Sequence, residues 1–516
     1  MATGNPSRRH GGRSARLAKR SAEVPREARV VQPGMPGGAY QPLTQEQMAQ
    51  IFDASLTLLD DIGMGQATPE FIDLVASAGG IFDKDERLHF PKSMIHTAIE
   101  NAAKEFTLYG FSPEHDVHIG GQRVHFSTGG AAVLMLEHET STFRHSSIKD
   151  VYEIGRVINA LEHIHIYVRT VVARDMETSR ELDLNTAYAI MASTTKPIGT
   201  SFFQPEHVHE VAQMFNIALT GDPDADEFRK RPFCIANNTF VVPPLRFAED
   251  SALCLAEQVR VGMPINLLSA GQAGATSPAR LAGSLTQALA ECLAGVTCVN
   301  LLSPGHPCTM GMWPFVSDLR TGAMSGGSGE EAVLNAAAAQ LINWIGLPSG
   351  VAAGMTDSKL PDQQAGHEKG TTVTLAAQAG ANVVFESAGM LASLLACSLE
   401  TLVIDNDLLG AVARTIRGIE VDSDSLAIEV IAEVVKGAGH FLGHEQTLRV
   451  MQTDYMYPAV GDRLSPEDWA DAGSLNVRAR ANRRVAEILA LPSPSHITPT
   501  AEVLIRDRFP IHLELA

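Results

Sequence analysis

Between residues 147 and 410 the sequence repeats one unit, in which a short apolar run ends in polar residues and an Ala-rich stretch with helical spacing follows. Strands that alternate with helices predict parallel βα units. Eight apolar runs are candidate strands, at residues 164–170, 198–203, 233–237, 265–269, 308–312, 351–355, 382–386 and 401–404. Eight such units predict an α/β protein built on a (β/α)8 TIM barrel. A doubly wound open sheet is the alternative, although no GxGxxG motif follows an early strand.

The stretches between these runs predict helices, and more helices follow the repeat. The expected helices within the repeat span residues 180–194, 205–219, 246–261, 278–302, 329–344, 371–379 and 390–398. Those after it span residues 427–436, 445–452 and 466–489. Each stretch has apolar residues at helical intervals, which predicts a helix that packs one face on a core.

The repeat divides the chain into four expected parts. Residues 1–41 are basic and rich in Gly, Pro and Arg, which predicts a flexible arm that grips a neighbouring subunit or the acidic body. A transit peptide and a nucleic-acid-binding tail are the alternatives for this arm. Residues 42–150 predict a helical and mixed cap, with hairpins at 106–130. Residues 151–420 form the expected barrel domain, and residues 421–516 a helical extension outside the barrel or at an oligomer contact.

The net charge of −19 argues against nucleic acid as the main partner, because a phosphate backbone selects a basic surface. The acidity favours a cationic substrate or serves only solubility. No apolar run of about 18 residues is present, so we expect no transmembrane helix. No apolar signal core begins the chain, and we expect a cytoplasmic protein.

The cysteines and histidines show no metal-binding pattern. The six cysteines form no CxxC pair and lie in apolar surroundings, which predicts reduced core residues. His115, His118 and His125 lie close together in the sequence, but their spacing fits no strong metal template, so we expect surface histidines. The sequence therefore predicts no metal site.

A polar cluster follows the sixth predicted strand, in the stretch GLPSGVAAGMTDSKLPDQQAGHEKG at residues 346–370. Ten of the fourteen side chains from residue 356 to residue 369 are polar or charged. In an α/β barrel the chemistry lies just past the carboxyl ends of the strands. Asp357, His367 and Glu368 are therefore the candidate catalytic residues, and Gln364 is a candidate for substrate binding. A solvated βα loop is the alternative.

The other predicted strand ends combine aromatic side chains with amides and carboxylates, and show no basic side chain. Phe202, Phe203, Trp313 and Glu386 are the candidates for substrate binding there. An aromatic face attracts a poorly hydrated cation by about 0.5–2 kcal/mol. This combination predicts a positively charged ligand, whereas barrel packing is the alternative for any one aromatic residue.

A second special loop, SAGQAGATSP at residues 269–278, supplies the last candidate, Gln272. Its glycines let backbone amides approach a ligand, and Pro278 begins a long helix whose amino end attracts a carboxylate. A tight βα turn is the alternative. The chain has no P-loop, no GxSxG motif and no HExxH motif.

Three motifs together are similar to a known family. GMTDSKLPDQQAGHEK, LLSAGQAGATSPARLAGSLTQALAECLAG and the Arg-rich start RRHGGRSAR resemble the trimethylamine methyltransferase (MttB-type) superfamily, over nearly the whole chain. The resemblance implies a TIM barrel that moves a methyl group from an amine onto cob(I)alamin. That cofactor would be carried by a separate corrinoid protein, so none would be bound to this chain.

True trimethylamine enzymes of the family carry pyrrolysine, which this sequence lacks. The resemblance therefore implies the pyrrolysine-free branch, similar to glycine betaine:corrinoid methyltransferase. In this interpretation Phe203, Trp313 and Phe202 cage a quaternary ammonium, and Asp357 or Glu386 supplies negative charge. A betaine carboxylate would bind His367, Gln364 or the amides of residues 271–274.

Several alternatives stay open at this point. Carnitine, proline betaine, choline, dimethylsulfoniopropionate or trimethylamine could replace glycine betaine as the substrate. A pyridoxal- or metal-dependent barrel lyase and a non-catalytic betaine-binding protein are rival classes. The Arg-rich start and the long C-terminal helices predict a homo-oligomer.

Overall fold

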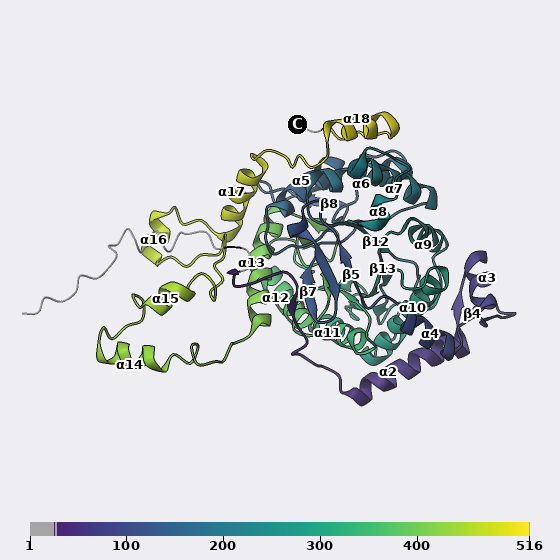
Figure 1. Cartoon of the computed structure of the whole chain (residues 1–516), viewed down its shortest axis with the longest axis horizontal. Coiled ribbons are helices and arrows are strands. Elements are labelled where there is room, and N and C mark those ends of the chain that lie inside the picture. Colours follow the sequence, from purple (N-terminus) through teal and green to yellow (C-terminus); the bar gives the residue numbers. More distant parts are fainter. Residues whose placement is uncertain (1–24, 26–27, 515–516) are drawn as a thin grey trace, which may run out of the picture.

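The computed structural model describes residue 25 and residues 28–514, and a curled nine-stranded sheet lies at its centre (Figure 1). In spatial order its strands are β1 (Met35–Pro36), β7 (Arg123–Phe126), β19 (Val383–Phe385), β18 (Ser349–Ala352), β15 (Cys308–Met312), β13 (Ile265–Ser269), β12 (Cys234–Asn238), β11 (Ile198–Thr200) and β10 (Tyr167–Val168). Every neighbouring pair from β7 to β10 is parallel, and β1 pairs antiparallel with β7.

The two ends of the parallel sheet meet. Ser127, directly after β7, forms a parallel bridge with Ile166, directly before β10. The backbone N–H of His165 also donates to the carbonyl oxygen of Phe126 at 2.8 Å. The sheet therefore curls far enough for its first and last parallel strands to contact each other.

Helices surround the outer face of the sheet in the order that the repeat predicts (Figure 1). They are α5 (Ile148–Asn159), α6 (Ser179–Ser193), α7 (Pro205–Thr220), α9 (Glu249–Val261), α10 (Leu281–Leu302), α11 (Gly329–Trp344), α12 (Gln363–Gln378) and α13 (Leu399–Arg417). Side chains satisfy free backbone N–H groups at several helix starts, as at α6, where Thr178 and Glu181 form a capping box. The helix α10 is long and apolar enough to cross a membrane, but 83% of its apolar window is buried, which identifies a core helix.

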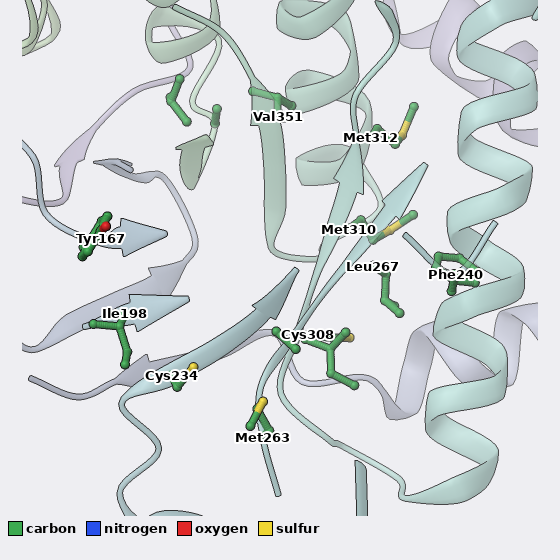
Figure 2. Close-up of a cluster of buried hydrophobic side chains, with 14 of the residues drawn as sticks. Tyr167, Ile198, Cys234, Phe240, Met263, Leu267, Cys308, Met310, Met312 and Val351 are labelled. Carbon is green, nitrogen blue, oxygen red and sulfur yellow. The ribbon is translucent and has the colours of Figure 1, made fainter. Parts of the chain in front are cut away.

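The core has two parts, because side chains alternate between the two faces of each strand. Leu267 and Met310 point outward toward Phe240, which packs on α10 (Figure 2). Leu268 and Phe385 instead belong to a separate buried cluster on the inner face of the sheet. All six cysteines are free and buried, which confirms the prediction that they are core residues.

The hairpin of β5 (Glu105–Leu108) and β6 (Val117–Gly120) lies at the amino ends of the strands. The backbone N–H of Tyr109, directly after β5, donates to Pro232, just before β12, and Phe111 donates to Thr195, just before β11. Leu108, Val117 and Ile119 contribute to the inner apolar cluster. This end of the sheet is therefore covered by protein, and any site must open at the carboxyl ends.

Two predicted elements are wrong. Residues 401–404 do not form the eighth strand, because they lie in α13, whose first turn is capped by Ser398. The eighth parallel strand is β7, from a region where we expected only hairpins. The predicted helix at 390–398 is a hairpin of β20 (Met390–Leu391) and β21 (Ala396–Cys397). Short apolar runs of this kind fit either element, and tertiary pairing decides between them.

The two chain ends differ from the predictions in detail. Of the predicted basic arm, residues 1–24 and 26–27 lie outside the described residues, whereas Val30 and Val31 are buried and β1 joins the sheet. The surface location predicted for His125 is wrong, because its side chain is buried. The helix predicted at 466–489 is two helices, α16 (Pro466–Asp471) and α17 (Val477–Leu489), separated by Gly473 and Ser474 at positive φ.

The remaining C-terminal helices are α14 (Ile428–Lys436), α15 (Glu445–Val450) and α18 (Pro499–Arg508). The last of these packs on α7, and α17 packs on α13. Smaller helices and strands precede β7: α2 (Gln45–Thr57), α3 (Pro69–Ser77) and α4 (Lys92–Asn101), with a small sheet of β2 (Met64–Gly65), β4 (Arg87–His89) and β3 (Ile81–Phe82). They pack largely against α10.

Candidate functional site

Glu386 is the first residue after β19 and is fully buried. Its φ is +61°, a left-handed conformation that costs free energy for a residue with a side chain. Its carboxylate lies over two glycines: a Cβ added to Gly129 or Gly130 would stand 3.2 or 3.1 Å from a Glu386 oxygen. Such a backbone conformation in a buried carboxylate indicates a position that the surrounding structure enforces.

The carboxylate of Glu386 is unsatisfied. Neither oxygen has a hydrogen-bond partner among the described residues. Burial raises the pKa of Glu386 to about 8, although the charges of Lys369 and Arg169 act in the opposite direction. Without a further cation nearby, this group is therefore mostly protonated at pH 7.

Glu331, in the first turn of α11, is a second carboxylate of the same kind, and sequence reasoning missed it. It is fully buried, and its two oxygens also find no hydrogen-bond partner within the part of the chain that the structure describes. Burial raises the pKa of Glu331 well above its ordinary value, and the carboxylates of Asp357, Glu386 and Glu368 raise it further. Glu331 and Glu386 therefore share one acidic, desolvated region.

Trp313 supplies an aromatic surface that contacts Phe385, the residue directly before Glu386. It follows β15, is almost fully buried, and packs its ring on Phe385 at a centroid distance of 5.5 Å and on Phe315 at 6.4 Å. Its indole Nε1 lacks a hydrogen-bond partner among the described residues, as does Nε2 of Gln272. Gln272 pairs with Phe315 through strand β14 (Gln272–Ala273) and strand β16 (Phe315–Ser317). Both predicted residues thus present unsatisfied donors near the carboxyl end of β15.

Arg169 corrects the expectation that no basic side chain lies at the strand ends. It directly follows β10 and is buried, with one hydrogen bond from Nη2 to Ser201 Oγ at 3.3 Å. Its Nε has no partner among the described residues. Burial lowers the pKa of Arg169, and the carboxylates of Asp183 and Glu386 act against that shift. The sequence predicts a strand that extends to residue 170, which places Arg169 inside the strand, whereas β10 ends at Val168.

Asp357 is held by the surrounding loops. It accepts hydrogen bonds from Ser325 Oγ at 2.9 Å, from the backbone N–H of Gly326 at 2.8 Å and from Ser393 Oγ at 2.6 Å. These donors come from two loops that are distant in the sequence. Asp357 therefore joins the loops around the site.

Glu368 is held in the same way. It accepts from the Asp357 N–H at 2.9 Å, from Gln364 Nε2 at 2.9 Å and from the Thr356 hydroxyl. A Cβ at Gly327 would lie 2.5 Å from its Oε2, so only glycine fits against this carboxylate. The structure brings the predicted residues Asp357 and Glu368 together, but each is already satisfied.

Of the other predicted residues, Gln364 contacts this group through its hydrogen bond to Glu368, whereas His367, Phe203 and Phe202 lie apart from it. His367 and Gln364 are exposed on α12, and His367 Nδ1 donates to the carbonyl oxygen of Gln363. Phe203 is exposed, and Phe202 packs in the outer apolar core rather than with Trp313. Within the described residues, no group of three or more His, Cys, Asp or Glu side chains is arranged to hold a metal ion.

Comparison with known proteins identifies the family. The family model of trimethylamine methyltransferase (MTTB) matches residues 9–509. The chain belongs to this family. Its members are methyltransferases, so this chain is an enzyme of that class.

Curated relatives are similar over most of their length. Trimethylamine methyltransferase MttB of Desulfitobacterium hafniense (strain DSM 10664 / DCB-2) is 29% identical, covering 90% of this chain and 93% of that protein. Trimethylamine methyltransferase MttB2 of Methanosarcina mazei is 32% identical, covering 86% and 90%. Glycine betaine methyltransferase of D. hafniense (strain Y51) is 28% identical, covering 90% and 96%.

A solved structure shares the fold. The monomethylamine methyltransferase (MtmB) of Methanosarcina barkeri superposes with a TM-score of 0.50 over 90% of each chain, at 12% identity. At this identity the likeness concerns the fold alone, an α/β arrangement around a curled sheet.

Proposed function

We propose that this chain transfers a methyl group from a quaternary amine, with glycine betaine favoured, to cob(I)alamin on a separate corrinoid protein. The supporting observation is the pair of buried carboxylates, Glu331 and Glu386, that have no hydrogen-bond partner among the described residues. Trp313 packs on Phe385, the residue directly before Glu386. A bound cation would let both ionise, and the indole face would add cation–π attraction.

A quaternary ammonium also suits the chemistry. Its nitrogen is already positive, so breaking one N–CH3 bond leaves a neutral amine that keeps the bonding electron pair. No proton donor is needed. Cob(I)alamin supplies the electron pair of the new cobalt–carbon bond. The protein then has to orient one methyl group toward the opening of the site and exclude water.

Arg169 favours a substrate that carries a carboxylate as well as the ammonium. Its guanidinium is buried at the same end of the sheet, with Nε unsatisfied by the described residues. Arg binds carboxylates with paired, charge-assisted hydrogen bonds. In this assignment Arg169 and Gln272 hold the carboxylate, Trp313 and the two glutamates hold the ammonium, and Asp357 and Glu368 position the loops.

We infer further that the sheet closes as an eight-stranded (β/α)8 barrel, supported by the bridge between Ser127 and Ile166. The catalytic unit then consists of residues 151–420 together with β7. A cytoplasmic location, a corrinoid protein as the partner and a homo-oligomer belong to the same proposal.

An anaerobic assay with reduced cobalamin and, separately, with a corrinoid protein would test the reaction. Absorbance of methylcobalamin would be followed for glycine betaine, carnitine, proline betaine, choline, dimethylsulfoniopropionate and trimethylamine. We expect methylation with carboxylate-bearing quaternary amines and none with trimethylamine. Tight betaine binding without methyl transfer, with either acceptor, would instead identify a non-catalytic binding protein.

A further inference from the structure

Glu291 lies in the middle of α10, the long apolar helix that packs on β13 and β15 (Figure 1). It is the one charged residue among the 22 residues of this helix, and its side chain is fully buried. A buried carboxylate costs free energy unless hydrogen bonds replace the water that it loses. The groups that donate to Glu291 therefore explain why an acid stands in an apolar core helix.

Three groups donate to this carboxylate, and two of them belong to the carboxyl ends of strands. Oε2 accepts from the hydroxyl of Ser269, the last residue of β13, at 2.5 Å. Oε1 accepts at 2.8 Å from the backbone N–H of Leu245, in the loop after β12, and at 3.1 Å from Gln287 Nε2. Leu245 has a φ of +50°, a left-handed conformation that the hydrogen bond to Glu291 helps to hold. Glu291 therefore ties α10 to two neighbouring strand ends.

Ser269 connects Glu291 to Trp313. The carbonyl oxygen of Ser269 accepts from the backbone N–H of Trp313 at 2.9 Å, while its hydroxyl donates to Glu291. Ser269 also pairs with Met312, the last residue of the adjacent parallel strand β15. The hydrogen bond to Glu291 therefore fixes the strand end to which the backbone of Trp313 is bound.

Gln287 connects Glu291 to Gln272. It lies one helical turn before Glu291, so the two side chains share one face of α10. Its Nε2 donates to the carbonyl oxygen of Thr276 at 3.0 Å as well as to Glu291. The Thr276 hydroxyl accepts from the Gln272 N–H at 2.8 Å, and the Thr276 N–H donates to the Gln272 carbonyl oxygen at 2.9 Å. The backbone of Gln272 is thus held by Glu291 through Gln287 and Thr276.

We propose that Glu291 is a positioning residue for the substrate site. This rests on the proposed function, which assigns Trp313 to the ammonium and Gln272 to the carboxylate of the substrate. Glu291 acts through these two residues, and its single carboxylate sets the separation between them. Because that carboxylate belongs to a packed core helix, the spacing of the two binding groups follows a rigid element rather than the loops that carry them.

Two substitutions of Glu291 separate its hydrogen bonds from its charge. Glu291→Leu keeps a similar volume but removes both acceptor oxygens, whereas Glu291→Gln keeps one acceptor and turns the other into a donor to the Ser269 hydroxyl. Asn300→Leu is the matched control. Asn300 is buried in the same helix and accepts from the Gly305 N–H at 3.0 Å, in the loop before β15 instead of after it.

Fluorine NMR of protein labelled with 5-fluorotryptophan tests the position of Trp313 without any substrate. The chain has three tryptophans, so Trp313→Phe assigns the resonance of Trp313, and Trp344 and Trp469 are internal references. We expect Glu291→Leu to shift or broaden the Trp313 resonance, and Glu291→Gln and Asn300→Leu to leave it unchanged. A Trp313 resonance that is unchanged in Glu291→Leu, or that changes equally in Asn300→Leu, would overturn the proposal.

Methyl-transfer kinetics test the consequence for the substrate. Glu291→Leu should lower kcat/KM for glycine betaine about a hundredfold, because a displacement of about 1 Å in a binding group has an effect of that size. Glu291→Gln should restore kcat/KM to within about threefold of the wild type, because its amide can form the same three hydrogen bonds. A hundredfold loss that Glu291→Gln does not restore would assign the effect to the charge of Glu291 and overturn the positioning role.

Gln287→Leu keeps the test decisive if Glu291→Leu does not fold. It leaves Ser269 bonded to Glu291 and removes only the link to Thr276. We expect KM for glycine betaine to rise about tenfold, with kcat within about threefold and the Trp313 resonance unchanged, because binding by Gln272 alone is weakened. An unchanged KM would overturn the proposal. A wild type that transfers no methyl group would contradict the proposed function instead, and the Trp313 resonance would still decide the positioning role.

Discussion

Two sets of buried or half-buried carboxylates lie around the same end of the sheet, and they differ in their partners. Asp357 and Glu368 each accept three hydrogen bonds. Asp405 forms an ion pair with Lys369 at 2.8 Å and accepts from the Gly389 N–H. Glu331 and Glu386 accept no hydrogen bond from any described residue.

The difference separates structural from functional carboxylates. A satisfied carboxylate fixes the loops that donate to it, whereas an unsatisfied one in a dry interior costs free energy that folding alone does not recover. Glu386 carries the additional cost of a positive φ. Such a cost in free energy is typical of groups that bind a ligand. Two carboxylates are suited to bind a cation.

The largest expected effect is on catalysis. Glu386→Gln and Glu331→Gln should each lower kcat/KM for the quaternary amine about a thousandfold, because a charge that holds the ammonium is lost. Thermal unfolding should show that both variants are at least as stable as the wild type. A loss of activity that follows a loss of stability would place these glutamates with the structural set.

The next effect concerns the ion pair of Lys369 and Asp405. Lys369→Met should lower the free energy of unfolding by about 3–5 kcal/mol in urea titrations, because Asp405 is left charged and unpaired in the interior. The double variant Lys369→Met with Asp405→Leu should recover most of that loss. A single variant costing less than about 1 kcal/mol would mean that the pair is not structural.

A third effect follows from the raised pKa of Glu386. Its folded pKa of about 8 lies above the ordinary 4.5 because of burial, so its stabilising contribution is complete below pH 4.5 and is lost as the pH rises toward 8. Between pH 6 and pH 8 the wild type should lose about 2 kcal/mol relative to Glu386→Gln. Chemical unfolding at both pH values measures this, and parallel stability curves would exclude the raised pKa.

The smallest effect is expected at the exposed residues of α12. His367→Ala and Gln364→Ala should change the free energy of unfolding by less than about 0.5 kcal/mol, as is usual for surface positions. Because His367 contacts only its own helix and Gln364 reaches the site only through its hydrogen bond to Glu368, the methyl-transfer rate should fall less than about tenfold. A thousandfold fall for His367→Ala would identify His367 as a catalytic residue. It would also weaken the assignment of function to the unsatisfied carboxylates Glu331 and Glu386.

The repeating pattern was enough to predict most of the sheet and its helices. Six predicted strands contain β10, β11, β12, β13, β15 and β19 or most of their residues, and the predicted strand at 351–355 covers half of β18. The eighth was misplaced because residues 401–404 have the composition of a strand but follow the helix cap Ser398. β7 was missed because it precedes the repeat, among residues that also form hairpins.

The site was predictable only in part, because burial and partners decide which polar groups are available. Trp313, Gln272 and Glu386 could be found from their positions at strand ends. Glu331 looks like an ordinary helix-start acid in the sequence SGEEA, and its burial depends on packing against distant loops. Arg169 was not recognised because the predicted strand ended two residues too late, at residue 170 instead of Val168.

Calorimetric binding of glycine betaine, compared with 3,3-dimethylbutyrate, tests the central claim most directly. The two ligands have the same shape, but a carbon replaces the cationic nitrogen in the second. We predict much tighter binding of the betaine at pH 7, with protons released as Glu386 and Glu331 ionise, and a smaller release in Glu386→Gln. Equal affinity for the two ligands, without proton release, would contradict the claim that the unsatisfied carboxylates bind a cation.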